Sequence, residues 1–156
     1  MHLNKLGGFH FNESKYGDDD LTVGSLKPYQ LFLIFCELVQ GIEETSNSDL
    51  SWMIDASHNL KDPMEDLLQS VETIKIAYAK ALLVDYNILR TFQQKNDVAA
   101  CQSTLQDAFR TDVRALVSES CYAAGGAIDP LKAYREFKIR QKLIEARGVN
   151  SKSTGL

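Results

Sequence analysis

The stretch Asp62-Pro63-Met64-Glu65 is the clearest helix start in the chain. An Asp side chain before a helix accepts a hydrogen bond from the free backbone N–H groups of the first turn, and proline is favoured at the first helical position. Glu at the third position after the cap completes the pattern. Apolar residues then recur at three- and four-residue steps as far as Phe92, so the sequence predicts a long helix over residues 62–93.

Two more helices are expected on the C-terminal side of this stretch. Lys95-Asn96-Asp97 is a short polar connection with its own cap, and an apolar stripe follows it as far as Gly125-Gly126. Such a short connection favours an antiparallel hairpin of two helices. Asp129-Pro130 repeats the start signal for a last helix that ends at Gly148.

On the N-terminal side, Ser25 can cap a helix that has Pro28 in its first turn and apolar residues nearly all round, which is typical of a buried helix. Ser48 can cap a short helix that extends to about Leu60. Residues 1–24 are rich in glycine. Within them Phe9-His10-Phe11 alternates like a strand, but the sequence offers it no partner strand.

The predicted fold is therefore all-α, a single-domain bundle of about five helices with a long central antiparallel αα-hairpin. We expect an irregular N-terminal arm over residues 1–24, the helical bundle over 25–148 and a flexible tail over 149–156.

Composition excludes several classes of protein. The chain has 156 residues, 44% of them hydrophobic, and a formal net charge of −4, so it is not a polycation that neutralises phosphates. Its three cysteines form no CxxC pair, which indicates reduced, buried thiols. No secretory signal and no apolar run of about 20 residues occur, so the sequence predicts a cytoplasmic protein with no membrane contact.

Candidate catalytic residues are few. Asp55 and His58 are three apart on a predicted helix, a spacing seen in metal-binding bundles, but no second pair accompanies them. The run Asp18-Asp19-Asp20 lacks the spacing of a calcium loop and is interpreted as a solvated turn.

Asp85 interrupts an apolar stretch of the predicted long helix, and we interpret it as a boundary residue or as the partner of Arg110 or Arg114. On that interpretation Asp85→Leu leaves the fold intact or stabilises it. Cys36 and Cys101 lie on apolar faces, which favours inert thiols over nucleophiles. The sequence therefore predicts no catalytic residue, no metal site and no cofactor.

Charge is distributed unevenly along the chain. Residues 37–72 contain nine acidic residues and one basic residue, whereas residues 131–147 contain six basic and two acidic ones. The last predicted helix has two apolar stripes with bases between them. Either one stripe docks on the bundle and the other meets a partner, or both pack internally and the bases only solvate the helix. The predicted partner-binding residues are Lys132, Arg135, Lys138, Ile139, Lys142 and Leu143.

With no catalytic motif, the sequence favours a non-enzymatic protein-protein interaction module: an adaptor, chaperone, inhibitor or assembly subunit. Its expected partner is another protein or a second copy of the chain, which would form a dimer. Binding of nucleic acid or another anionic ligand by the basic last helix is one alternative. An enzyme that uses Asp85, His58 or a bound metal is the other.

Overall fold

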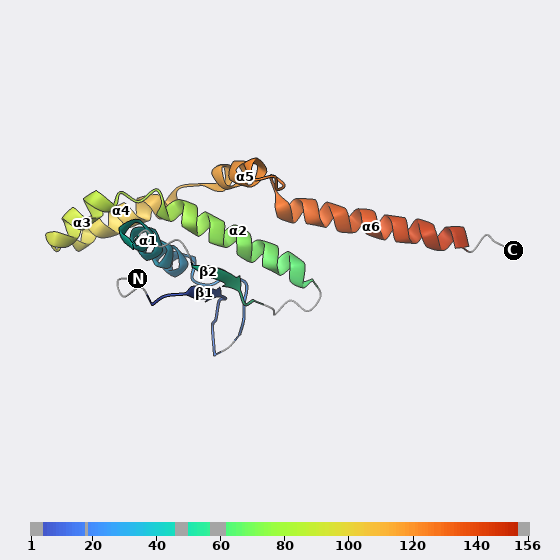
Figure 1. Cartoon of the computed structure of the whole chain (residues 1–156), viewed down its shortest axis with the longest axis horizontal. Helices are drawn as coiled ribbons and strands as arrows, with labels where there is room; N and C mark the ends of the chain where they lie inside the picture. The colour runs from blue at the N-terminus through green and yellow to red at the C-terminus, as the bar shows by residue number, and fades with distance from the viewer. Residues whose placement is uncertain (1–4, 18, 46–49, 57–61, 153–156) are drawn as a thin grey trace. The chain divides into compact units, whose positions relative to one another are not determined.

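The computed structural model describes residues 5–17, 19–45, 50–56 and 62–152 (Figure 1). The mostly helical fold expected from the sequence is confirmed, with six helices and one two-stranded sheet in this described part. The chain divides into two compact units, Met1–Val117 and Ser118–Leu156. The predicted arm, bundle and tail boundaries stay predictions. In chain order the elements are β1 (Gly8–Phe11), α1 (Pro28–Thr45), β2 (Ser51–Ile54), α2 (Pro63–Ala81), α3 (Tyr86–Gln94), α4 (Val98–Arg110), α5 (Arg114–Ala123) and α6 (Pro130–Lys152).

Strands β1 and β2 are parallel, and α1 is the crossover helix between them. Two expectations are therefore wrong: Phe9-His10-Phe11 does have a partner strand, and residues 51–54 form that strand instead of a helix. Trp52 and Ile54 are aromatic and β-branched residues that suit a strand, but a partner some 40 residues away leaves no local signal. Of the rest of the predicted helix, residues 48–49 and 57–60 lie outside the described residues, and Leu50, Asp55 and Ala56 are described but lie in no helix.

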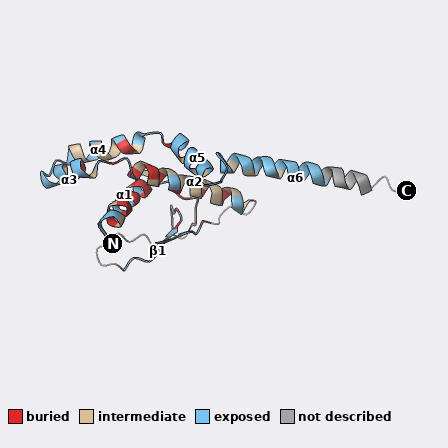
Figure 2. Cartoon of the chain, turned by 45° about the horizontal axis from the view of Figure 1, so that its top comes forward, coloured by how far each residue is buried: buried red, intermediate tan, exposed pale blue. Residues whose placement is uncertain are grey.

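The core of the first unit surrounds α1, as expected for a helix with apolar residues nearly all round. Figure 2 shows buried residues concentrated on this helix, and Phe32 and Phe35 are fully buried. Phe35 contacts the rings of Phe11 in β1 and Trp52 in β2, with centroid distances of 5.7 and 5.4 Å. These aromatic rings attach one face of the sheet to α1.

Helix α2 begins as predicted, because Asp62 accepts a hydrogen bond from the Glu65 backbone N–H at 3.3 Å and Pro63 follows it. The predicted single helix over residues 62–93 is wrong, since α2 ends at Ala81 and α3 begins at Tyr86. Asp85 is the N-cap of α3 and accepts from the backbone N–H groups of Asn87 and Ile88 at 3.1 and 3.0 Å. A capping Asp inside an apolar run thus starts a new helix.

The expected ion pair between Asp85 and Arg114 is also wrong. That side chain lies against Asp112 instead, with 2.6 Å between Nη2 and Oδ2. Hydrogen bonds from the side chain and the backbone N–H of Arg114 hold the pKa of the Asp112 carboxyl well below its usual range.

We expect Asp85→Ala to lower the free energy of unfolding by ~1 kcal/mol, because two N–H groups of α3 lose their acceptor. Because Leu would also remove the cap, Asp85→Leu should lower the stability as well, and the expectation that it leaves the fold intact or stabilises it no longer holds. Urea denaturation measures this difference. Glu72→Ala, which removes an exposed acid inside α2, is the control and should change stability by less than ~0.5 kcal/mol. Equal midpoints for the two variants would show that the cap contributes nothing.

The last three helices differ from the predicted bounds. Asp97 caps α4 as expected, with a 3.0 Å bond from the Ala100 N–H, but the helix ends at Arg110 and α5 follows separately. In the second unit Asp129 accepts from the Lys132 N–H at 2.8 Å, and α6 continues past Gly148 to Lys152.

Among the described residues, no helix combines the length and apolar character needed to cross a membrane.

Candidate functional site

The site begins on the sheet face that turns away from α1. Side chains alternate between the two faces of a strand, so Phe9 and Phe11 point towards the helices and His10 points the opposite way. His10 Nδ1 lies 3.5 Å from Asp55 Oδ2, and each side chain is about three-fifths exposed, at 62% and 61%. Met53, which is opposite His10 in the register, is also exposed.

The segment after β1 forms a closed loop that carries more carboxylates. Glu13 and Leu21 exchange two backbone hydrogen bonds of 3.0 and 2.8 Å, which join the two ends of the loop. Within it, Asp19 accepts from the backbone N–H groups of Lys15 and Tyr16. Asp20 has a left-handed backbone with φ of +47°, and its Oδ1 accepts from Asn12 Nδ2 at 3.2 Å.

His10, Asn12 and Asp55 lie at the carboxyl ends of the two parallel strands. His10 is in the second half of β1, Asn12 comes directly after β1, and Asp55 comes directly after β2. Ligands of open parallel sheets bind at this end of the strands. The group His10, Asn12, Asp20 and Asp55 is called the carboxyl-end site below.

The chemistry of the carboxyl-end site follows from the pairing of an imidazole with a carboxylate. A carboxylate beside the ring nitrogen orients the imidazole, which can then take up or release a proton. Both groups are also ligands of divalent metals. No cluster of three or more potential metal ligands occurs within the described ranges.

The sequence predicted no catalytic residue at these positions. Asp55 was expected on a helix beside His58, but it follows a strand and pairs with His10. His58 and Asp18 lie outside the described residues. The turn expected for the acidic run agrees with the backbone hydrogen bonds that Asp19 accepts, although Asp19 and Asp20 are only partly exposed. The alternation around His10 is the signal that could have found the missed residue, had a second strand been recognised.

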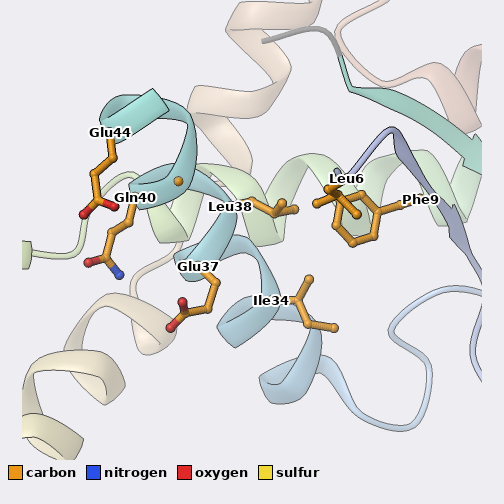
Figure 3. A pocket seen from close by; sticks show the side chains of 8 residues that line it. Leu6, Phe9, Ile34, Glu37, Leu38, Gln40 and Glu44 are labelled. Atoms are coloured by element: carbon orange, nitrogen blue, oxygen red, sulfur yellow. The ribbon is translucent and has the colours of Figure 1, made fainter. Parts of the chain in front are cut away.

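A pocket lies between β1 and the outer side of α1 (Figure 3). It has a volume of about 390 Å³, and Leu6, Phe9, Ile34 and Leu38 make it mainly apolar. At the edge of the pocket, Glu44 Oε1 lies 3.2 Å from Arg90 Nη2. An apolar groove with a paired carboxylate is better suited to packing than to proton transfer.

Of the cysteines expected to be buried, Cys36 is buried, whereas Cys101 and Cys121 are only partly buried. Cys36 is buried, and burial raises the pKa of its thiol to about 11. A thiol with this pKa is protonated at neutral pH and does not act as a nucleophile.

The predicted partner-binding residues all lie on α6. Ile139 and Leu143 are more than half exposed, and Lys138 Nζ lies 5.6 Å from the centre of the Tyr134 ring. No contact in the structure tests a partner, so this assignment stays a prediction.

Two curated proteins with sequences similar to this chain are both named as enzymes. No family model matches the chain. A protein of Mesorhizobium japonicum named probable sugar isomerase is 47% identical over 148 residues, and a protein of Rhizobium meliloti with the same description is 45% identical over 148. These matches cover 94% of this chain and 34% of each relative, so the chain spans about a third of their length.

The prediction of a non-enzymatic interaction module is therefore wrong, and so is its adaptor role, because both relatives are named as enzymes. That prediction rested on the absence of a local catalytic motif. The carboxyl-end site has no such motif, since its members lie on separate strands and one loop.

Proposed function

We propose that this chain is part of a sugar isomerase and supplies catalytic groups through the carboxyl-end site. The observation that carries the proposal is the 47% identity, over 94% of the chain, to a protein named probable sugar isomerase. The His10–Asp55 pair supports it, because it gives the chain a pair of groups suited to proton transfer.

The open sheet supports the idea of a larger enzyme. Parallel sheets are usually covered on both faces, and two strands alone are marginally stable in water. Here α1 and α2 cover one face, while His10, Met53 and Asp55 are exposed on the other. The relatives have two thirds of their length outside the matched stretch. That additional polypeptide would cover the open face and enclose the carboxyl-end site.

Interconversion of an aldose and a ketose moves a hydrogen between two neighbouring carbons. In the proposed site, His10 takes the proton from the carbon that bears the hydroxyl group and returns it to the neighbouring carbon, while the hydroxyl proton passes through solvent to the former carbonyl oxygen. Asp55 holds the imidazole in place during both steps. A divalent metal can instead polarise the two sugar oxygens, which chelation distinguishes from proton transfer alone.

The test uses a chimera, which is the Mesorhizobium japonicum relative with its matched stretch replaced by the corresponding residues of this chain. The chimera and the relative are incubated with a panel of aldoses and ketoses, and conversion is followed by NMR. Both should convert the same sugar. A folded chimera that is inactive beside an active relative would contradict a functional site in this chain. A relative that converts no sugar would contradict the proposed reaction.

The same assay identifies the chemistry. Dialysis against a chelator leaves conversion unchanged if His10 and Asp55 act alone. Conversion that stops and returns on addition of Mn²⁺ assigns the polarising step to a metal.

A further inference from the structure

Helix α6 is unusual for a long helix, because none of its side chains from residue 130 to residue 145 is buried (Figure 2). Most of the stability of a helix in a protein comes from packing one of its faces against a neighbour. Ile139 and Leu143 are 59% and 55% exposed, and large apolar side chains exposed side by side mark a binding surface. The apolar residues of α6 therefore indicate a docking surface.

Basic side chains surround these two apolar residues on one side of α6. The steps from Lys132 to Arg135, to Ile139 and then to Lys142 or Leu143 are three or four residues long. Side chains at such steps are neighbours on the surface of a helix, so these five residues share one side. They are called the basic face below. Three of its five members carry a positive charge.

The pocket on the outer side of α1, called the α1 pocket below, has the complementary character (Figure 3). Ile34, which is 46% exposed, and Leu38 give it apolar walls. Glu37 and Glu44 add two carboxylates, and Figure 3 shows both on the same side of α1. Glu44 also contacts Arg90, but a carboxylate has several acceptor sites and can bind a second base.

The charges of the two surfaces have the same spacing. Glu37 and Glu44 are seven residues apart on α1, and Arg135 and Lys142 are seven residues apart on α6. Seven residues make about two helical turns, or roughly 10.5 Å along the axis. Two helices packed side by side can thus place each carboxylate opposite a base, with Ile139 against the apolar part of the α1 pocket.

We propose that the basic face of α6 binds the α1 pocket of a second copy of this chain, so that two copies form a dimer through reciprocal contacts. Charge favours this occupant, because every copy supplies both the carboxylates and the bases. Direct pairing of two α6 helices is disfavoured, since residues 131–147 have six basic and two acidic side chains. Reciprocal contacts also close the assembly at two copies. The dimer does not depend on the proposed reaction.

The first measurement is the mass of the 156-residue chain in solution, by sedimentation equilibrium over a range of concentrations. We expect twice the 17.5 kDa of one chain. A chain that stays monomeric at the highest concentration overturns the proposal and leaves the basic face to another partner. A mass that keeps growing beyond the dimer also overturns it, because the contacts would then form an open, head-to-tail assembly.

Two charge-reversal variants test the two surfaces. The pocket variant has Glu37→Lys and Glu44→Lys, and the helix variant has Lys132→Glu, Arg135→Glu and Lys142→Glu. In each variant alone, the basic-face positions and the α1 pocket have charges of the same sign. We therefore expect the dissociation constant of the dimer to rise by roughly 100-fold or more.

A mixture of the two variants gives the sharpest result. In it the positive pocket of one variant meets the negative helix of the other, and the two unmodified surfaces meet as well. An equimolar mixture should therefore sediment as a dimer. The control, Glu72→Lys with Asp107→Lys, reverses exposed acids outside the α1 pocket and should stay dimeric.

Far-UV circular dichroism of each variant confirms that it is folded. Variants that dimerise alone as tightly as the unmodified chain overturn the proposal, because neither surface would then lie in the interface. Folded variants that remain monomeric when mixed overturn it too, since the basic face and the α1 pocket would not bind each other.

Discussion

Replacing His10 with Asn is expected to lower kcat of the chimera by roughly 10²–10⁴-fold, the range that one general acid–base group contributes. Asn has a similar polar side chain but cannot exchange a proton at neutral pH. His10 lies on the exposed face of β1 and its side chain is mostly accessible to solvent, so the fold should remain intact. Steady-state kinetics gives the loss, and far-UV circular dichroism confirms the fold.

Asp55→Asn tests the other half of the pair. Its amide can accept a hydrogen bond from the imidazole but carries no charge, so we expect a loss of the same kind and smaller size. Asp107→Asn is the matched control, because Asp107 is an exposed acid on α4 outside the carboxyl-end site. Normal kinetics in His10→Asn would assign the reaction to other groups, whatever the result for Asp55.

Local signals in the sequence predicted where helices begin. Asp62, Asp97 and Asp129 each accept a hydrogen bond from a backbone N–H three residues on, as their position before a helix indicated. Capping depends on neighbours in the sequence, so it can be recognised without a structure. Asp85 obeys the same rule, but the apolar residues around it favoured an uninterrupted helix and hid the cap.

The carboxyl-end site escaped prediction because it depends on contacts between distant residues. His10 and Asp55 meet only when two four-residue strands pair across helix α1. Strands this short contain too few residues for their alternation to be distinguished from a helical pattern. Asn12 and Asp20 likewise meet through the closure of a loop, which no motif in the sequence encodes.

Phe35→Ala is expected to have the largest effect on stability, because this side chain joins the sheet to both covering helices. Phe35 is fully buried in α1, and its ring also lies 6.0 Å from that of Tyr78 in α2. Truncation of a buried Phe costs about 3–5 kcal/mol through lost burial and the cavity left behind. Small domains have only about 5–15 kcal/mol in total, so the first unit should lose a large part of its stability.

Trp52 makes this loss directly measurable. It is the single tryptophan of the sequence, and its ring lies 5.4 Å from that of Phe35, so its fluorescence reports on the strand that precedes Asp55. Urea unfolding followed at this fluorophore should show a much lower midpoint for Phe35→Ala. Phe137→Ala, which truncates a phenylalanine that is 54% exposed, should shift stability by less than ~0.5 kcal/mol. Similar midpoints in the two variants would mean that the aromatic contacts do not hold the sheet on α1, and the support beneath His10 and Asp55 would have to come from elsewhere.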